Sequence, residues 1–146
     1  MNIGKLTYSE SLIDYIISIE EEYISSAELC IKSDCKEIEK CLNSGCSFGL
    51  FDGDKLVGFS LCYYSDYCTG YIEKTFILPA YRGCGYQKEL TKTNLTALKC
   101  LGVDEVYSMV SPNNIASKKS LTSVGFRKKK DVVYNGLQRV ILKLNQ

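Results

Sequence analysis

The 146-residue sequence contains no histidine. It therefore lacks the commonest general base and cannot form a Ser–His or Cys–His nucleophile pair. Any chemistry must come from carboxylates, tyrosines, thiols or the backbone. Four clustered cysteines do not follow zinc-ribbon spacing, and no histidine is present to complete a mixed site. We therefore predict no metal site. The clustered cysteines are Cys30, Cys35, Cys41 and Cys46.

An excess of one charge and a long apolar run are also missing. The 18 basic residues nearly balance the 17 acidic ones, so no global field favours a nucleic acid or a membrane surface. No apolar run approaches the ~20 residues of a membrane span, and the N-terminal MNIGKLTYSESL lacks the core of a signal peptide. We expect a cytoplasmic protein that binds neither nucleic acid nor membrane.

The length and composition fit one domain, residues 1–146, with one core, because 45% of the residues are hydrophobic. The eight cysteines form no CxxC pair. We therefore expect reduced thiols rather than a disulfide framework.

Apolar spacing and turn residues predict the element order β-α-α-β-β-β-α-β-α-β-β. Hairpins joined to strand–helix–strand units indicate an α/β fold. We expect a mixed, mostly antiparallel central sheet of about seven strands, flanked by helices on both faces. The expected elements are a strand at 1–8, helices at 11–24 and 34–43, a hairpin of 46–52 and 55–64, a strand at 71–78, a helix at 88–102, a strand at 103–110, a helix at 115–124 and a hairpin around Asn135-Gly136.

The first helix is expected to follow Ser9 or Ser11 as its N-cap. Helical spacing continues beyond this helix through Leu29 and Ile31. Three consecutive glutamates near its end are expected to form a solvated face, with a contribution to an acidic acceptor pocket as the alternative. They are Glu20, Glu21 and Glu22.

Four tyrosines crowd the end of the first hairpin and the loop that follows it. Packing at the solvent edge of a strand is the ordinary interpretation, and an aromatic acceptor pocket is the alternative. They are Tyr63, Tyr64, Tyr67 and Tyr71.

The stretch from Tyr71 to Gly102 predicts a strand, a glycine turn and a helix. The first turn of a helix leaves N–H groups without intrahelical partners, and the macrodipole favours an anion there. Gly83 and Gly85 allow positive φ and a close approach of a ligand. The turn lacks the Lys-Ser/Thr of a Walker loop and the third glycine of a dinucleotide fingerprint. It therefore predicts a phosphate cradle of another kind, and a nucleotide-binding α/β domain is one alternative.

Two motifs resemble the GNAT superfamily of acyl-CoA N-acyltransferases. ILPAYRGCGYQKEL is similar to its cofactor motif, an apolar strand and a proline followed by [QR]xxGx[GA]. Arg82 and Gly85 match, whereas Gln87 stands where glycine or alanine is usual. NNIASKKSLTSVGF is similar to the family's NxASxxxLxxxGF helix. The resemblance covers about residues 56–142.

The resemblance implies that the parallel strands 71–78 and 103–110 splay apart and admit coenzyme A. It implies acetyl-CoA as cosubstrate and a primary amine of a small molecule or peptide as acceptor, and it allows a homodimer. A catalytically inactive coenzyme A-binding module is the alternative. The implied cofactor-binding residues are Phe76 and Ile77 for the pantetheine arm, Arg82, Gly83, Cys84, Gly85, Tyr86, Gln87 and Lys88 for the pyrophosphate, and Asn114 and Ser117 on the other side.

For catalysis, the resemblance implies Glu73 as the general base, because some relatives carry a catalytic carboxylate at this position. A cross-strand charge partner is the alternative role. The tyrosine that serves many relatives as the general acid is replaced by Leu121, and a glutamate of other relatives is replaced by Met109. Tyr107 and Tyr134 are the candidate substitutes, with proton transfer through water as an equal alternative.

Overall fold

The computed structural model describes residues 1–24, 32–65 and 68–145. The elements follow the predicted order. Four residues singled out above, Leu29, Cys30, Ile31 and Tyr67, lie outside the described residues. The elements are β1 (Asn2–Lys5), α1 (Glu10–Tyr23), α2 (Cys35–Asn43), β2 (Phe48–Asp52), β3 (Lys55–Tyr64), β4 (Thr69–Ile77), the short 3-10 helix η1 (Pro79–Tyr81), α3 (Tyr86–Cys100), β5 (Glu105–Val110), α4 (Ile115–Ser123), β6 (Phe126–Tyr134) and β7 (Leu137–Leu144).

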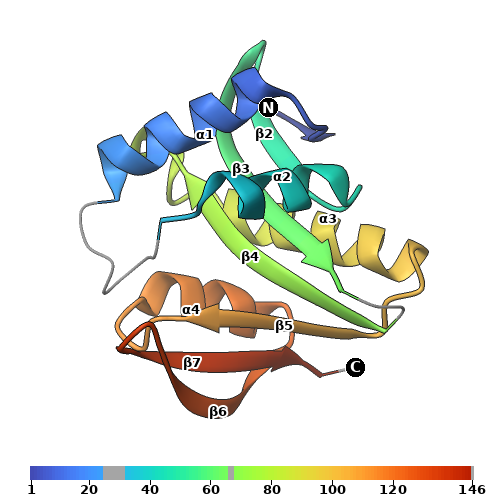
Figure 1. The fold of residues 1–146 in the computed structure, drawn as a ribbon, viewed down its shortest axis with the longest axis vertical. Coiled ribbons are helices and arrows are strands. Elements are labelled where there is room, and N and C mark those ends of the chain that lie inside the picture. Colours follow the sequence, from blue (N-terminus) through green and yellow to red (C-terminus); the bar gives the residue numbers. More distant parts are fainter. Residues whose placement is uncertain (25–31, 66–67, 146) are drawn as a thin grey trace.

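The strands form one seven-stranded sheet in the order β1-β2-β3-β4-β5-β7-β6. Only β4 and β5 run parallel, and every other neighbouring pair is antiparallel. Helices α1 and α2 cover one face of the sheet, while α3 and α4 lie on the other (Figure 1). The predicted mixed, mostly antiparallel sheet with helices on both faces is confirmed.

Local capping and turn chemistry explain several element ends. Ser9 is the N-cap of α1, since its Oγ accepts a hydrogen bond from Leu12 N at 3.1 Å. The β6–β7 turn places Asn135 at φ 52° and Gly136 at φ 75°, as a two-residue turn with positive φ at both positions requires. β4 begins two residues before the predicted strand, because Thr69 and Gly70 already pair with β5.

The two faces of the sheet have separate cores. Under α1 and α2, Ile16 and Ile38 pack with Phe59 and Leu61 of β3. On the other face, Leu98 of α3 packs with residues of β4, β5 and β7. The core thiols Cys41, Cys46 and Cys62 are free, which agrees with the predicted reduced state of these residues.

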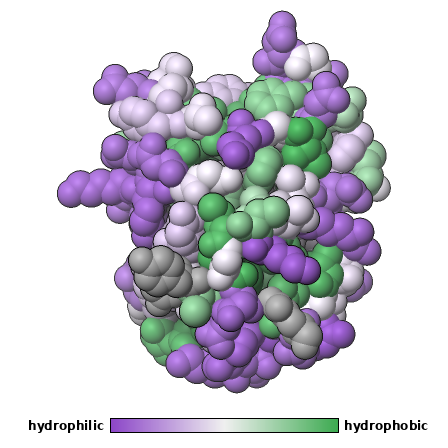
Figure 2. Space-filling view, turned by 90° about the vertical axis from the view of Figure 1, so that its right-hand side faces the viewer, coloured by the Kyte–Doolittle hydropathy of each residue, from purple (hydrophilic) through white to green (hydrophobic). Residues whose placement is uncertain are grey.

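The surface shows no separation of hydrophobic from hydrophilic residues on the face that Figure 2 shows. On the face shown in Figure 2, hydrophilic and hydrophobic residues are interspersed over the described part of the chain. Among the described residues, no helix is long and apolar enough to cross a membrane.

β4 contains one extra residue, Glu73, relative to β3. Ile72 and Lys74 pair with consecutive residues of β3, so Glu73 has no partner in the ladder. Such a β-bulge shifts the alternation of side chains between the two faces. Ile72 therefore packs in the core beneath α3, whereas Lys74 reaches Glu20 of α1 on the opposite face.

Candidate functional site

The parallel pairing of β4 and β5 stops in the middle of the sheet. The last matched residues are Ile72 and Ser108. β4 then continues to Ile77 and β5 to Val110 with no further pairing between them. Figure 1 shows the two ribbons separating toward their carboxyl ends. We call this region the β4–β5 splay, and it confirms the predicted separation of the two strands.

Beyond Ile72, the edge of β4 that faces the splay pairs with no strand in the described part of the chain. Leu78 N–H donates to Val57 O of β3 at 2.9 Å, and successive residues direct their backbone groups to opposite edges of a strand. Thr75 and Ile77 therefore face the splay, while Phe76 faces β3. The register leaves the Phe76 N–H and C=O on the β3 side, and the cofactor-binding role of Phe76 stays a prediction.

The N-terminus of α3 lies just beyond this edge. Gly83 and Gly85 both adopt φ of 82°, and Gly85 is the N-cap, without a side-chain cap. Among the described residues, no acceptor is found for the backbone N–H groups from Gly83 to Lys88. A Cβ on either glycine would meet no atom within 4 Å. The cradle is therefore open, and its donors fit a pyrophosphate.

Side chains of this segment have different roles. Arg82 donates from Nε to the Ile77 carbonyl at 2.8 Å and lies over the Phe76 ring at 5.3 Å, so it ties the turn to the end of β4. Tyr86 packs in the cluster beneath α3, whereas Cys84 is exposed. Gln87 is half-buried in the first turn of α3.

Asn114 and Ser117 lie together at the start of α4, after the carboxyl end of β5. The Asn114 side chain is the N-cap of α4, and its Oδ1 accepts from Ser117 N at 3.2 Å. This contact gives the pair a capping role. It leaves the Asn114 amide nitrogen and the Ser117 hydroxyl with no hydrogen bond to the described residues.

A buried polar network fixes α3 against the strands below the cradle. Asn94 of α3 accepts a hydrogen bond from Ser60 Oγ at 2.5 Å and donates to the Cys46 carbonyl at 2.7 Å. Ser60 Oγ also lies 2.8 Å from Thr75 Oγ1. The side chain of Thr75 is thus held under α3 while its backbone faces the splay.

The bulge turns Glu73 toward α2 beside the last β4–β5 pair. Burial raises the pKa of Glu37 of α2 to about 7, and the neighbouring carboxyl groups of Glu73 and Asp34 act in the same direction. The sequence interpretation named Glu73 and missed Glu37.

A row of stacked tyrosines crosses three central strands beside Glu73. The Tyr63 and Tyr71 rings lie 5.0 Å apart, and Tyr71 and Tyr107 lie 6.1 Å apart. Burial, followed by the charge of Glu73, raises the pKa of Tyr63 to about 12, so its phenol stays protonated. Tyr63 and Tyr71 lie on the inner strands β3 and β4, so the expected packing at a solvent edge is wrong for these two residues, whereas Tyr64 at the end of β3 is exposed.

The candidate acids occupy different places. Tyr107 lies on β5 opposite Tyr71, one pair before the splay begins, with Lys129 Nζ and Lys143 Nζ within 6 Å of its ring centre at 5.6 and 5.7 Å. Tyr134 is 46% exposed at the tip of the β6–β7 hairpin. Leu121 is buried in the core beneath α3 and α4.

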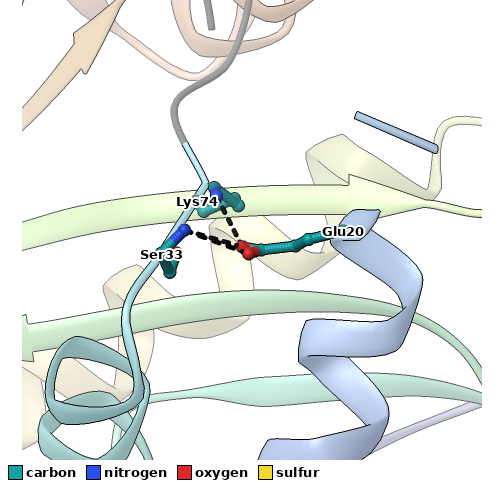
Figure 3. A network of polar contacts seen from close by, with 3 residues as sticks. All are labelled: Glu20, Ser33 and Lys74. Atoms are coloured by element: carbon teal, nitrogen blue, oxygen red, sulfur yellow. Dashed lines mark hydrogen bonds and ion pairs between the residues drawn. The ribbon is translucent and has the colours of Figure 1, made fainter. Parts of the chain in front are cut away.

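Glu20 is buried, contrary to the expected solvated face. It is 1% exposed, and its Oε1 lies 2.6 Å from Lys74 Nζ. Both carboxylate oxygens also accept from Ser33 N, at 3.2 and 3.0 Å (Figure 3). This network links α1, β4 and the chain that leads into α2. Glu21 and Glu22 are exposed, as predicted.

Solved structures share this fold. Naa50 from Arabidopsis thaliana, in complex with the bisubstrate analogue CoA-Ac-MVNAL, is 15% identical over 100% of both chains, with a TM-score of 0.83. Ard1 from Thermoplasma volcanium is 12% identical over 99% of this chain and 98% of its own, with a TM-score of 0.81. A GNAT family acetyltransferase from Elizabethkingia anophelis with acetyl-CoA bound is 13% identical over 68% of this chain and 75% of its own, with a TM-score of 0.59. At these identities the likeness establishes the fold.

The family follows from the sequence itself. No curated protein matches the chain in a sequence search. The model of the acetyltransferase (GNAT) family, however, matches residues 14–126, which span the first helix, the cradle and the second motif. The chain therefore belongs to the acetyltransferase (GNAT) family.

Proposed function

We propose that this protein is an N-acetyltransferase that transfers an acetyl group from acetyl-CoA to a primary amine of a small molecule or peptide. The observation that carries the proposal is the β4–β5 splay, which ends beside an open, uncapped α3 N-terminus. Family membership supports it, as do the similar structures that hold acetyl-CoA or the analogue CoA-Ac-MVNAL.

Backbone groups are proposed to hold the cosubstrate. When bound, acetyl-CoA supplies the acetyl thioester. Thr75 and Ile77 would pair with the pantetheine arm along the open edge of β4, as an added strand would. The N–H groups from Gly83 to Lys88 would hold the pyrophosphate, with Asn114 and Ser117 on the opposite side of the splay.

Each chemical role has a candidate group. A backbone N–H near Ile77 would donate to the thioester carbonyl oxygen, where negative charge develops. Glu73 would take the proton that the acceptor ammonium must lose before it attacks. Tyr107 or Tyr134 would protonate the leaving thiol, with water as the alternative. The chemical class of the acceptor, the formation of a homodimer and the cytoplasmic location of the protein stay predictions.

A coupled assay tests the function. Free thiol released from acetyl-CoA is measured with a panel of peptide N-termini, lysine side chains, polyamines and small primary amines, and mass spectrometry identifies the acetylated product. Turnover above the rate without amine supports the proposal. Tight binding of acetyl-CoA with no turnover on any amine would favour the inactive coenzyme A-binding module.

A further inference from the structure

The stacked rings of Tyr63, Tyr71 and Tyr107, here called the tyrosine row, lie beside the point where β4 and β5 separate. Tyr71 pairs with Tyr107 in the register position directly before Ile72 and Ser108, the last matched residues. Each of the three tyrosines is half-buried, so part of each ring is accessible. The row can therefore contact a molecule that approaches the end of the β4–β5 pairing from this face.

The β5 end of the row lies on the face of the sheet opposite α3 and α4. Val106, Val110 and Leu142 are buried in the core on the α3 and α4 side, so the alternate residues Tyr107 and Lys143 face the other way. In the described part of the chain, no residue of β5, β6 or β7 belongs to the core that α1 and α2 cover. This part of the face is therefore not built into the α1–α2 core.

Two lysines lie beside the Tyr107 ring on this face. Lys129 Nζ of β6 is 5.6 Å from the ring centre, and Lys143 Nζ of β7 is 5.7 Å from it. Lys143 is paired with Glu105 at 3.3 Å. Within the described ranges, no carboxylate lies at ion-pair distance from Lys129, which is exposed. An uncompensated positive charge is thus placed next to the tyrosine row.

A bulge in β6 separates Lys129 from the lysine before it. Lys128 pairs with Leu142, whose side chain is buried on the α3 and α4 side, and its Nζ binds Asp131 at 2.8 Å. The register of β6 with β7 shifts directly after Lys128, and Lys129 reaches the Tyr107 ring on the opposite face. Of these two neighbouring lysines, only the one near the tyrosine row lacks a carboxylate partner among the described residues.

We propose that the acceptor is a peptide with acidic residues at its second and third positions, which lies over the Tyr107 ring with its carboxylates at Lys129 and Lys143. This inference rests on the proposed N-acetyltransferase function and names its acceptor. The N-terminal amine lies at the end of the β4–β5 pairing, where the thioester is expected. Charge complementarity selects an acidic partner, because a basic one would bring like charges together.

The spacing of the strands favours a peptide over a free amino acid. β7 and β6 follow β5 in the sheet. Neighbouring strands lie about 4.8 Å apart, so the two lysines belong to main chains about 5 and 10 Å to the side of β5. An extended peptide advances about 3.3 Å per residue, which brings its second and third side chains toward the lysines. A free amino acid carries its carboxylate within one residue of its amine, too close to span this distance.

The first test compares three peptides of equal length in the turnover assay. They share an N-terminal residue that the amine panel shows to be accepted, and their second and third residues are both glutamate, both glutamine or both lysine. The wild-type kcat/KM should be about tenfold higher with the glutamate peptide than with the glutamine peptide, mainly through KM, and lowest with the lysine peptide. The preference should shrink at about 1 M salt, where the screening length is about 3 Å.

Charge reversal at Lys129 tests the assigned contact. Lys129→Glu should lower kcat/KM for the glutamate peptide about tenfold and raise it for the lysine peptide, while the affinity for acetyl-CoA stays within about twofold. Lys128→Glu is the matched control, because it makes the same change of charge one residue away on the opposite face of β6. It should leave the preference among the three peptides within about twofold of the wild type.

The second test measures binding without turnover. The protein is saturated with coenzyme A, which carries no acetyl group, and the three peptides are titrated into it by calorimetry. The glutamate peptide should bind about tenfold more tightly than the glutamine peptide. Lys129→Glu should remove this difference, and Lys128→Glu should keep it.

The outcomes separate this inference from the proposed function. Turnover of peptides with no preference for the glutamate peptide would overturn the inference and leave the function standing, as would a preference that Lys129→Glu and Lys128→Glu change equally. Free glutamate used as well as the glutamate peptide would rule out the peptide as the acceptor. No turnover with any amine would refute the function, whereas binding of the glutamate peptide that depends on Lys129 would still support the acidic-peptide surface.

Discussion

Among single residues, the carboxylates on the α1–α2 face differ in what neutralises them. Glu20 is compensated by the Lys74 ammonium and the Ser33 N–H. Glu37 instead has the carboxyl groups of Glu73 and Asp34 as neighbours, and burial together with these neighbours raises its pKa. The same face therefore carries a carboxylate compensated by a cation and a carboxyl group that binds a proton more tightly than usual.

Glu73→Gln should lower kcat/KM about a hundredfold, because a positioned base contributes on the order of 10²–10⁴ in rate. The affinity for acetyl-CoA should stay within about twofold of the wild type, since the Glu73 side chain points to α2 and not along the splay edge. Steady-state kinetics and calorimetric titration measure the two quantities. An unchanged kcat/KM would mean that another residue is the general base.

Glu37 should make stability depend on pH. Its folded-state pKa of about 7 lies above the ordinary glutamate value of about 4.3, so the folded protein binds the extra proton between these values. Its contribution to the free energy of unfolding is fully present below pH 4 and is lost as the pH rises through 7. Urea unfolding should show this decline in the wild type relative to Glu37→Gln. Parallel curves for the two proteins would argue against the raised pKa.

Among the secondary-structure elements, a buried ion pair joins Glu20 of α1 to Lys74 of β4. Glu20 also accepts hydrogen bonds from Ser33 N, in the chain that leads into α2. Glu20 and Lys74 are 1% and 9% exposed. Removing one partner of a buried pair leaves a charge in a poorly solvated place, whereas replacing both removes that penalty. The network therefore fixes how α1 and α2 sit over β4.

Lys74→Met should lower the free energy of unfolding by about 3 kcal/mol, because the Glu20 carboxylate then keeps only the Ser33 N–H. The double variant Glu20→Leu/Lys74→Met should recover at least half of this loss. Urea denaturation of both variants measures the effect. A double variant no more stable than the single one would show that the charge was not the cause.

A negative charge placed at the start of α3 should weaken the binding of acetyl-CoA. Gly85→Glu adds a carboxylate beside the proposed pyrophosphate donors and should weaken acetyl-CoA binding at least a hundredfold by repulsion. Gly102→Glu is the matched control, because Gly102 has φ 81°, has equal space around it and follows the other end of α3. Calorimetric titration compares the two. Equal affinities would contradict the cradle.

These elements also show what the sequence can reveal. The cradle and the Asn135-Gly136 turn are predictable, because their glycines act within a few residues. Ile13, Ile16 and Glu20 share helical spacing, so the burial of Glu20 can be seen in the sequence, although a charged residue usually indicates a solvated position. The bulge at Glu73 depends on the pairing of two strands, and no local pattern marks that register.

In the whole protein, one core cluster spans the splay, because Leu98 of α3 packs with residues of β4, β5 and β7. Beyond Ile72 and Ser108, β4 and β5 no longer pair with each other. A ligand in the splay would contact both strands, so its binding should be coupled to global stability.

Acetyl-CoA at about one hundred times its Kd should raise the free energy of unfolding by about 2.7 kcal/mol. Thermal unfolding should then show a higher Tm with acetyl-CoA and no shift with ATP or NAD at the same concentration. A shift with ATP or NAD and none with acetyl-CoA would instead support the nucleotide-binding alternative.

The bulge at Glu73 has a further consequence for how the sequence can diverge. The proposed cosubstrate edge of β4 relies on the main chain at Thr75 and Ile77, which every amino acid except proline supplies. The opposite face before the bulge instead carries a side chain, that of Tyr71, in the tyrosine row. Under the proposed function, substitution at Tyr71 can therefore change the acceptor face while the main-chain contacts to the cosubstrate are kept.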